Sequence, residues 1–519
     1  MTPSVALHTA AAVRALEARA LAASGRDGTV LMRRAAAAAL TALRARWPVA
    51  RDIVVLCGAG NNGGDGWMLA GLARAAGFSP QVLWTTPPAA LRGEAAQAAA
   101  EALAAGVPAS AFAAVGGATG GATGGATVQL ARADVIVDAL LGLGLVQAVR
   151  PPVAAAIEAI NAAGRPVLAL DLPSGLCADS GRVQGVAVRA DVTITFIALK
   201  AGLRLGAGPD HAGEVRLATL GIVDDLGPPA WSLLGASQVR AAVPARRRDA
   251  HKGQGGHVFV VGGGSGMPGA ARLAGEAALR VGAGRVTVAC AADSAAAIAA
   301  GRPELMVRGL PTEPADAATA LRGLLADADV LVVGPGLGRD GWARAVLDAV
   351  LAAAKPTVVD ADALHLLGTA KVDAQSAPQQ APRVYTPHPG EAGRLLGLTA
   401  AAVQTDRPAA LAALVARLGG VVVLKGAGTL LATSGSIPVV CDRGDPVLAA
   451  PGTGDVLAGA IAGLLAQSGD AWGATCAAVW SHARAGELAA NAASRGVFAG
   501  EVAERLPAAL AEALSGPLR

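Results

Sequence analysis

Aromatic residues and cysteines are scarce in this 519-residue chain, in which Phe, Trp and Tyr together make up 3%. The five cysteines are far apart and form no CxxC pair, which argues against a zinc site or a disulfide framework and indicates a reducing compartment. No uncharged apolar run reaches the roughly 18 residues of a membrane span. Charged residues interrupt the alanines near the N-terminus, unlike in a signal peptide. We therefore expect a cytoplasmic protein without a membrane partner.

A strong excess of charge of one sign is also missing. The chain has 43 basic and 39 acidic residues and a formal net charge of +4. Nucleic-acid binding would need a basic stripe with stacking aromatic residues, and the sequence has none. The basic triplet Arg246-Arg247-Arg248 is interpreted as a solvated linker face. No nucleic-acid partner is expected.

Hydrophobic residues, mostly alanine, make up 53% of the chain, and short apolar runs alternate with helical stretches. This pattern is typical of βαβ units and mostly parallel sheets. It loosens around residues 222–245 and then restarts, which predicts an α/β fold of two domains, residues 1–225 and 226–519. Two polar stretches, residues 116–127 (GGATGGATGGAT) and 371–382, are interpreted as inserts, the first of them flexible and on the surface. Strands are expected at residues 53–57, 81–84, 135–138, 166–171, 191–195, 258–261, 285–290, 330–333, 357–360, 384–386 and 421–424, and helices at residues 9–23, 33–46, 269–281, 342–353, 408–418 and 454–467.

Glycine loops are frequent, but most of them are weak evidence. The dinucleotide pattern GxGxxG occurs at residues 58–63, 264–269 and 336–341 of a chain with 68 glycines. A hydride-transferring Rossmann enzyme also needs an acidic residue at the end of the next strand. The strand at residues 81–84 is instead followed by Thr-Thr-Pro-Pro, so this interpretation fails. No Lys-Ser or Lys-Thr pair follows a glycine loop, which excludes a Walker A site.

The first glycine loop, residues 58–66, has the sequence GAGNNGGDG and precedes a helix expected from Trp67. Its amide oxygens suit a monovalent cation, and the helix start favours a phosphate. Asp138 and Asp171 close two further strands of the same half. Because the carboxyl ends of parallel strands converge on one crevice, these polar groups are expected to form a single site.

The second half has a similar set of strand ends. Residues 452–455, GTGD, precede an apolar helix whose first amides can hold a phosphoryl group, with Asp455 beside it as a base. Lys425 opens a further glycine turn, and His388 lies between two prolines in TPHPGE, where a stiff turn is the alternative to a ligand contact. The remaining histidines of interest are interpreted as structural, namely His8, His211, His365 and His482.

These motifs resemble two known domain families. GAGNNGGDG at residues 58–66, VDALLG at 137–142 and DLPSG at 171–175 are similar to the NAD(P)H-hydrate epimerase domain of YjeF N-terminal type. The second half resembles the ADP-dependent NAD(P)H-hydrate dehydratase domain, and it does so through KGQGG at residues 252–256, GMPGAARLAGEAALRVGAG at 266–284, GPGLG at 334–338, DADAL at 360–364, TPHPGE at 386–391, LKGAGT at 424–429 and GTGDVLAG at 452–459. In this order the two halves resemble the bifunctional nicotinamide nucleotide repair enzymes. The resemblance implies an N-terminal Rossmann-like three-layer αβα sandwich and a C-terminal ribokinase-like α/β domain.

The resemblance also implies the site residues. In the epimerase half, Asp171 is the candidate acid/base, and the K+ ligands are Asn62, Asp138 and Ser174. The hydrated dinucleotide would be contacted there by Asn61, Asn62, Gly63, Gly64, Asp65, Gly142, Leu143, Gly144, Leu145, Val146, Gln147, Ala148 and Asp171. In the dehydratase half, Asp455 is the catalytic carboxylate, and the dinucleotide would be contacted by Ala270, Gly336, His388 and Asp455. The ADP-binding residues would be Lys425, Gly426, Ala427, Gly428, Thr429 and Gly454.

The implied reaction is repair of hydrated NADH and NADPH (NADHX and NADPHX). The epimerase would interconvert the R and S forms, and the dehydratase would return the S form to NAD(P)H while ADP gives AMP and phosphate, with Mg2+ bridging the phosphates. A homo-oligomer is expected. Two alternatives remain: a ribokinase-like small-molecule kinase fused to a binding module, and an N-terminal domain that binds dinucleotide or a partner protein without catalysis.

Overall fold

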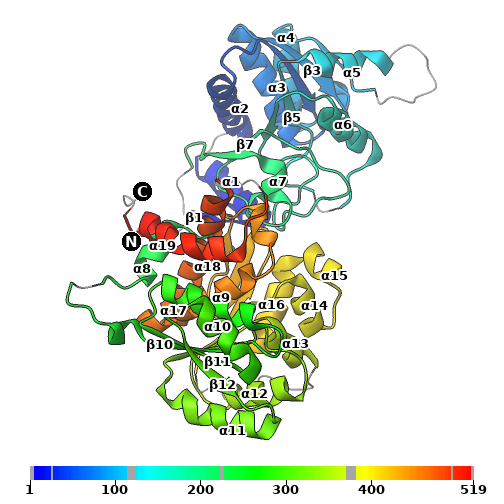
Figure 1. The fold of residues 1–519 in the computed structure, drawn as a ribbon. Coiled ribbons are helices and arrows are strands. Elements are labelled where there is room, and N and C mark those ends of the chain that lie inside the picture. The colour runs from blue at the N-terminus through cyan, green and yellow to red at the C-terminus, as the bar shows by residue number, and fades with distance from the viewer. Residues whose placement is uncertain are drawn as a thin grey trace. The chain divides into compact units, whose positions relative to one another are not determined.

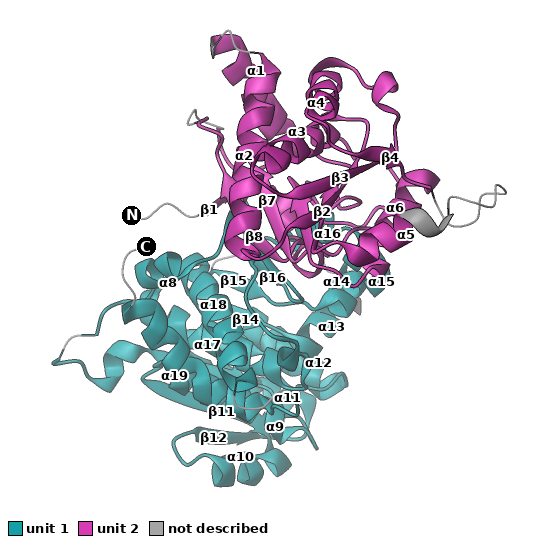
Figure 2. Cartoon of the chain, turned by 90° about the horizontal axis from the view of Figure 1, so that it is seen from above, with its two compact units in different colours: residues 1–5, 232–519 teal, residues 6–231 magenta. Residues whose placement is uncertain are grey.

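The computed structural model describes residues 5–24, 27–113, 123–145, 147–222, 227–246, 248–369, 381–491 and 495–515. The chain divides into two compact units, which are coloured separately in Figure 2. Unit 2 comprises residues 6–231, and unit 1 comprises residues 1–5 and 232–519. The short strand β1 (Val5–Leu7) has residues in both. Among the described helices, none is long and apolar enough to cross a membrane.

Unit 2 is built on a seven-stranded parallel sheet within the described residues, in the order β4-β3-β2-β5-β6-β7-β8. Its strands are β2 (Asp52–Cys57), β3 (Ser79–Trp84), β4 (Ala109–Ala111), β5 (Val135–Ala139), β6 (Val167–Leu170), β7 (Val192–Phe196) and β8 (Glu214–Ala218). Its helices are α1 (Ala10–Ser24), α2 (Gly28–Arg46), α3 (Asn61–Ala75), α4 (Gly93–Ala104), α5 (Thr123–Arg132), α6 (Pro151–Ala162) and α7 (Gly208–Ala212).

Alternate side chains of the central strands belong to different cores, which gives unit 2 three layers. Val55 and Val137 pack in one hydrophobic cluster with α2, α3 and α4. Val54 and Ile136, their neighbours in the strands, pack in another cluster with α5 and α6. Successive side chains of a strand point to opposite faces, so both faces of the sheet are covered by helices. The predicted Rossmann-like αβα sandwich is confirmed (Figure 1).

Unit 1 contains the larger sheet, which runs β9-β18-β17-β16-β15-β14-β13-β10-β11-β12 within the described part of the unit. Strands β10 to β16 are parallel, whereas β17 is antiparallel to both of its neighbours. The strands are β9 (Trp231–Leu233), β10 (His257–Val261), β11 (Arg285–Ala291), β12 (Met306–Leu310), β13 (Val330–Val333), β14 (Thr357–Val359), β15 (Arg383–Tyr385), β16 (Val421–Leu424), β17 (Thr429–Thr433) and β18 (Val439–Cys441).

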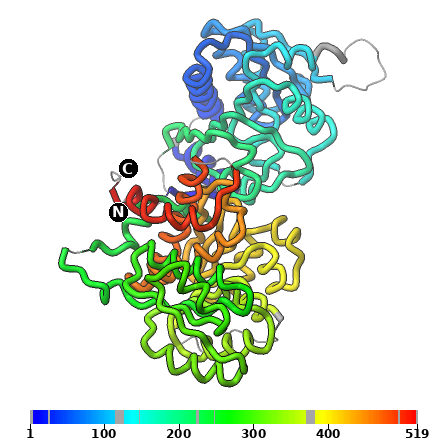
Figure 3. The backbone as a smooth tube through the Cα atoms, in the orientation of Figure 1, coloured from blue at the N-terminus to red at the C-terminus, as the bar shows by residue number. Residues whose placement is uncertain are grey.

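Two groups of helices accompany this sheet. The alanine-rich helices α9, α17, α18 and α19 share one hydrophobic core with the sheet, and the last three run beside one another in orange and red in Figure 3. Helices α11 to α16 pack among themselves and against β13, β16 and β17. The helices are α8 (Ala236–Ala242), α9 (Pro268–Arg280), α10 (Ala295–Gly301), α11 (Pro314–Leu324), α12 (Gly341–Leu351), α13 (Ala361–Thr369), α14 (Pro389–Leu396), α15 (Ala400–Thr405), α16 (Arg407–Leu418), α17 (Thr453–Ser468), α18 (Ala471–Ala490) and α19 (Ala499–Ser515).

The strands and helices predicted from apolar periodicity are all present, with ends shifted by a few residues. The prediction for residues 116–127 is partly wrong, because residues 123–127 form the first turns of α5 and the side chain of Ala126 is buried. Residues 116–122 lie outside the described part of the chain, as do 371–380 of the second predicted insert. Short strands with few apolar residues, such as β4 and β8, were not predicted, because they lack a continuous apolar run.

Candidate active sites

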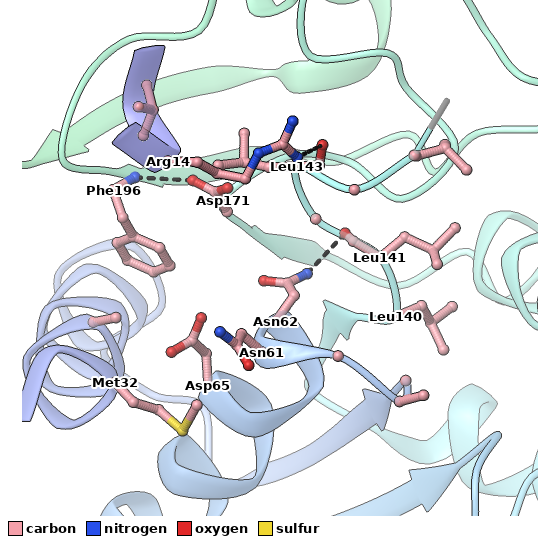
Figure 4. A pocket seen from close by; sticks show the side chains of 18 of the residues that line it. Arg14, Met32, Asn61, Asn62, Asp65, Leu140, Leu141, Leu143, Asp171 and Phe196 are labelled. Atoms are coloured by element: carbon pink, nitrogen blue, oxygen red, sulfur yellow. Dashed lines mark hydrogen bonds between the residues drawn. The ribbon is translucent and has the colours of Figure 1, made fainter. Parts of the chain in front are cut away.

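A cavity of about 730 Å³ lies at the carboxyl ends of the unit 2 strands. Its lining includes residues that follow β2, β3, β5, β6 and β7, together with parts of α1 and α2 (Figure 4). The structure places most of the predicted epimerase residues there, namely Asn61, Asn62, Asp65, Gly142, Leu143, Gly144, Leu145, Gln147, Ala148 and Asp171. Val146 lies outside the described residues. Gly63 and Gly64 are not among the lining residues.

The predicted helix start at Trp67 is wrong, because α3 already begins at Asn61. The glycines of this motif therefore allow close packing of a helix instead of forming an open loop. A Cβ atom on Gly63 would lie 2.1 Å from the Gly58 carbonyl oxygen, and one on Gly66 would lie 2.6 Å from the Ala139 Cβ. The first turn of α3 is thus pressed against the ends of β2 and β5, which places Asn62 and Asp65 beside the cavity.

Asn62, Asp138 and Ser174 form one buried cluster. The Ser174 hydroxyl donates to Asp138 Oδ1 at 2.6 Å, and the Ser174 amide donates to Oδ2 at 2.7 Å. Asn62 Nδ2 donates to the Leu141 carbonyl at 2.8 Å, but Asn62 Oδ1 is buried without a hydrogen-bond partner. Burial raises the pKa of Asp138 to about 6, although the hydrogen bonds from Ser174 oppose the shift. The fully buried carboxylate and the unpartnered amide oxygen are connected through Ser174 and Leu141, and such oxygens suit a cation.

Asp171 lies in the turn after β6 with a φ of +63°, a left-handed conformation that is unusual for a residue other than glycine. It forms an ion pair with Lys200, whose side chain is only 1% exposed. Lys200 also donates to the Thr195 hydroxyl at 3.0 Å and the Phe196 carbonyl at 2.6 Å. Backbone and side chain of Asp171 are therefore both held in place.

Several cavity residues were missed by the sequence analysis, notably Arg14 and Glu17 of α1 and Lys200 after β7. Arg14 donates to the Leu143 carbonyl at 3.1 Å and so connects α1 to the loop over the cavity. Burial, followed by the charge of Asp171, raises the pKa of Glu17. Neither α1 residue stands in a recognisable motif. Lys200 did leave a signal, because it is the only lysine in the first 251 residues.

The second candidate site lies at the start of α17 in unit 1. Gly452 takes a φ of +89°, and no side chain caps the helix, so its first amides face outward without a side-chain acceptor. Gly454 is next to Lys425, since a Cβ atom on this glycine would lie 3.2 Å from Lys425 Nζ. Burial, followed by the charge of Asp360, raises the pKa of Asp455 to about 7. The arrangement combines anion-binding amides, an ammonium group and a carboxyl group that titrates near neutral pH.

Lys425 is held by two carboxylates. Its Nζ lies 2.7 Å from Asp360 Oδ1 and 3.8 Å from Glu391 Oε2. Asp360 also accepts from the Thr386 hydroxyl at 2.7 Å. Burial disfavours a charged lysine, but the two carboxylates outweigh this effect and raise the pKa of Lys425. Burial also raises the pKa of Glu391, to about 7. The result is a fixed positive charge beside Gly454.

Of the predicted contacts to the dinucleotide in unit 1, Gly336 lies in the turn after β13 and Ala270 in the first turn of α9. Gly336 and Ala270 are close, because a Cβ atom on Gly336 would lie 3.0 Å from that of Ala270. His388 caps α14, because its ring accepts a hydrogen bond from the Gly390 amide at 3.0 Å. This is the stiff turn that the sequence offered as the alternative to a ligand contact. The side chain of His388 is 55% exposed. His482 was treated as an ordinary helix residue, but its Nε2 lies 2.9 Å from the Thr453 carbonyl. Burial lowers the pKa of His482 to about 4, so the neutral ring donates to this carbonyl.

Arg407 organises the turn that follows Lys425. This 5% exposed residue donates to the carbonyls of Leu424, Lys425 and Gly428 at 3.1–3.2 Å. Burial lowers the pKa of its guanidinium to about 10. Because the carbonyls point toward Arg407, the turn is fixed by a buried charge from α16.

We expect Arg407→Met to raise the KM for ADP, the nucleotide that the resemblance assigns to this turn, by about tenfold or more, because one buried and two partly buried carbonyls lose their donor, at roughly 1–3 kcal/mol each. Arg417→Met removes an exposed arginine from the same helix and should leave the KM unchanged. Steady-state kinetics with varied ADP would measure both. An unaltered KM in Arg407→Met would show that the turn keeps its shape without this residue.

Comparisons with known proteins define the class of each unit. Residues 28–202 match the family model described as YjeF-related protein N-terminus, and residues 258–508 match the model described as NAD(P)H-hydrate dehydratase. A ribokinase-like superfamily protein from Enterococcus faecalis is 29% identical, with a TM-score of 0.50 over 56% of this chain and 100% of its own. The predicted ribokinase-like fold of the second half is therefore confirmed.

Relatives that span both units give the family. A bifunctional NAD(P)H-hydrate repair enzyme of Coxiella burnetii is 43% identical over 92% of this chain and 93% of its own length. The enzyme of the same description from Escherichia coli is 40% identical over 90% and 87%, and that of Leishmania infantum is 37% identical over 96% and 92%. The chain belongs to the family of bifunctional NAD(P)H-hydrate repair enzymes.

Proposed function

We propose that the chain repairs hydrated NADH and NADPH, with the epimerase site in the cavity of unit 2 and the dehydratase site at the start of α17 in unit 1. The observation that carries the proposal is the position of Asp455, at the uncapped start of α17. The adjoining Gly454 lies against Lys425. Amides and an ammonium group can hold a phosphate there while a carboxylate deprotonates the hydroxyl that receives it.

In the dehydratase reaction the substrate hydroxyl attacks the β-phosphorus of ADP, and AMP leaves. Asp455 takes the hydroxyl proton, and the amides of α17 with Lys425 stabilise the charge on the transferring phosphoryl group. The hydroxyl has then become a phosphate, which is a better leaving group. Its departure together with a proton from the adjacent ring carbon restores the dihydropyridine ring. The turn that Arg407 fixes, residues 425–429, is the proposed ADP-binding segment, and Ala270, Gly336 and His388 are the proposed contacts to the dinucleotide.

We expect Mg2+ to enter with the nucleotide, because this ion usually binds through substrate phosphates and one or two carboxylates. Within the described residues there is no group of three or more His, Cys, Asp or Glu placed to hold a metal ion. The cytoplasmic location and the homo-oligomer stay predictions.

Beside the epimerase cavity we assign Asn62, Asp138 and Ser174 to K+; Asn62 lines the cavity, whereas Asp138 and Ser174 are not among its lining residues. The support is the unpartnered Asn62 Oδ1 and the buried Asp138 carboxylate, whose oxygens suit a hard monovalent cation. When bound, the ion would add a positive charge beside the anionic substrate.

K+ should therefore raise the melting temperature of the protein relative to choline at equal ionic strength. Binding at 100 times Kd stabilises a folded unit by about 2.7 kcal/mol. The Asn62→Ala variant should lose this difference between the two salts, which calorimetry would measure. An equal response of the two proteins would place the ion elsewhere.

The function as a whole is tested by incubating the purified protein with mixed NADHX epimers and ADP. Recovery of NADH beyond the amount of the S form requires both activities, because the dehydratase alone would stop when the S form is used up. Accumulation of a stable phosphorylated product would instead favour the small-molecule kinase. Consumption of the S form alone would favour an N-terminal domain that only binds.

A further inference from the structure

Two carboxyl groups face the unit 2 cavity from different elements. Asp65 lies on the second turn of α3, and Asp171 lies in the turn after β6. Both line the cavity, and Figure 4 shows their side chains pointing into it from opposite sides. The two groups have different surroundings, and this difference assigns them different chemical roles.

Asp171 is a carboxylate with one free oxygen. The ammonium of Lys200, the Phe196 amide at 3.1 Å and the Thr195 hydroxyl at 3.4 Å all donate to Oδ1. The ion pair with Lys200 fixes the position of this carboxylate. Among the described residues none donates to Oδ2, so this oxygen remains available to accept a proton from the cavity.

Asp65 has no such partner. Within the described residues its carboxyl group forms neither a hydrogen bond nor an ion pair, and Lys200 is already paired with Asp171. Burial, followed by the charges of Asp171 and Glu17, raises the pKa of Asp65 well above its ordinary value. The other charged groups that line the cavity are Arg14, Glu94 and Arg150, and Arg14 is directed to the Leu143 carbonyl. These surroundings favour the protonated form of Asp65 over the ionised form.

We propose that Asp65 is the proton donor of the epimerase and Asp171 the matching acceptor on the opposite side of the substrate ring. This inference rests on the proposed epimerase function. Asp65 protonates the hydroxyl on carbon 6, the carbon–oxygen bond breaks, and water leaves while the ring nitrogen lone pair forms a nitrogen–carbon double bond. A water molecule then adds to carbon 6 from the other face, its electron pair returns the lone pair to nitrogen, and Asp171 takes its proton.

The two proton transfers in this reaction explain why it needs one protonated and one ionised carboxyl group. One proton moves from Asp65 to the departing water, and one moves from the arriving water to Asp171. The enzyme then has the reversed protonation states, which suit conversion of the other epimer, and exchange with cavity water restores the starting form. Acid–base catalysis commonly uses two titratable groups whose surroundings give them different proton affinities.

The test is Asp65→Asn, which keeps the size of the side chain and removes the acidic proton. We expect the kcat of epimerisation to fall by about 10²–10⁴-fold, with the KM changed little and the alkaline limb of the pH profile lost. Dehydration of the purified S epimer should continue at the wild-type rate, which shows that unit 1 is folded, and an unchanged melting temperature would show the same for unit 2. Glu158→Gln neutralises an exposed carboxyl group on α6, outside the cavity lining, and should keep epimerisation.

A second measurement follows the oxygen atom. The wild-type enzyme in water labelled with heavy oxygen should place the label on carbon 6 of the epimerised product faster than uncatalysed exchange. Epimerisation by Asp65→Asn at the wild-type rate, or epimerisation without label, would overturn the inference. If the wild-type protein did not epimerise NADHX at all, the proposed function itself would fail, which is a different outcome.

Discussion

Asp455→Asn is expected to reduce the kcat of dehydration by about 10²–10⁴-fold, because the phosphoryl acceptor then loses its general base. Asparagine has nearly the same shape as aspartate, so the start of α17 and the position of Lys425 should be preserved. The nucleotide should still bind, since its proposed contacts are the amides of the helix and the turn at residues 425–429. Kinetics with the S epimer and calorimetric titration with ADP would separate these two effects.

The pH profile provides an independent check on this role. The pKa of Asp455 is raised to about 7, so a growing fraction of the group is protonated as the pH falls below that value. A base must be ionised, and kcat should therefore fall by about tenfold for each pH unit below the pKa. Glu391 has a pKa raised to about 7 as well, so Glu391→Gln is the necessary comparison and should keep the acidic limb.

Two controls test whether the effect of Asp455→Asn is specific to dehydration. Asp348→Asn neutralises an exposed carboxylate on α12 and should leave dehydration intact. The epimerase activity of Asp455→Asn should also be unchanged, because its proposed site lies in the other unit. Dehydration at the wild-type rate in Asp455→Asn would remove this residue from the chemistry.

The layered fold could be predicted because apolar periodicity follows directly from burial. Val135, Ile136 and Val137 are all fully buried, and a continuous apolar run is typical of a parallel strand covered on both faces. The meeting of Asp171 with the first glycine loop at one cavity could also be predicted, because parallel strands present their carboxyl ends at one edge. Both inferences depend on local sequence and on a general rule of sheet topology.

Other features depend on contacts between distant segments. The glycines after β2 were interpreted as an open loop, whereas they allow α3 to pack closely on Gly58 and Ala139. His482 stands in an alanine-rich helix without any motif, and only the fold brings its ring to the Thr453 carbonyl. Periodicity contains no information on such contacts.

The scarcity of lysine in this chain points to residues of the candidate sites, and motifs alone did not reveal it for Lys200. The chain has five lysines among its 43 basic residues, and two of them, Lys200 and Lys425, are paired with carboxylates at the two candidate sites. The ammonium group is a compact point charge with three rotatable donors, so Lys200 can serve Asp171, Thr195 and Phe196 from one position. In a chain that otherwise uses arginine, a lysine after a strand indicates a buried, specific charge.

The second large effect is expected from Lys200→Met, which leaves the 8% exposed Asp171 without its counter-ion. Breaking a buried pair by removing one partner costs about 3–5 kcal/mol. For a unit of this size that corresponds to a fall in melting temperature of roughly 10 °C. Epimerisation should be lost as well, because the carboxylate of Asp171 then loses the ion pair that positions it toward the substrate.

The double variant Lys200→Met/Asp171→Asn separates stability from chemistry. With both charges removed, no unpaired charge remains buried, so most of the lost melting temperature should return. Epimerisation should stay absent, because asparagine cannot accept the proton. Differential scanning calorimetry and the rate of epimer exchange, measured on the two single variants and the double variant, complete the cycle. Recovery of both properties in the double variant would show that the pair only stabilises the fold, and the acceptor of the proton would then have to be another group of the cavity.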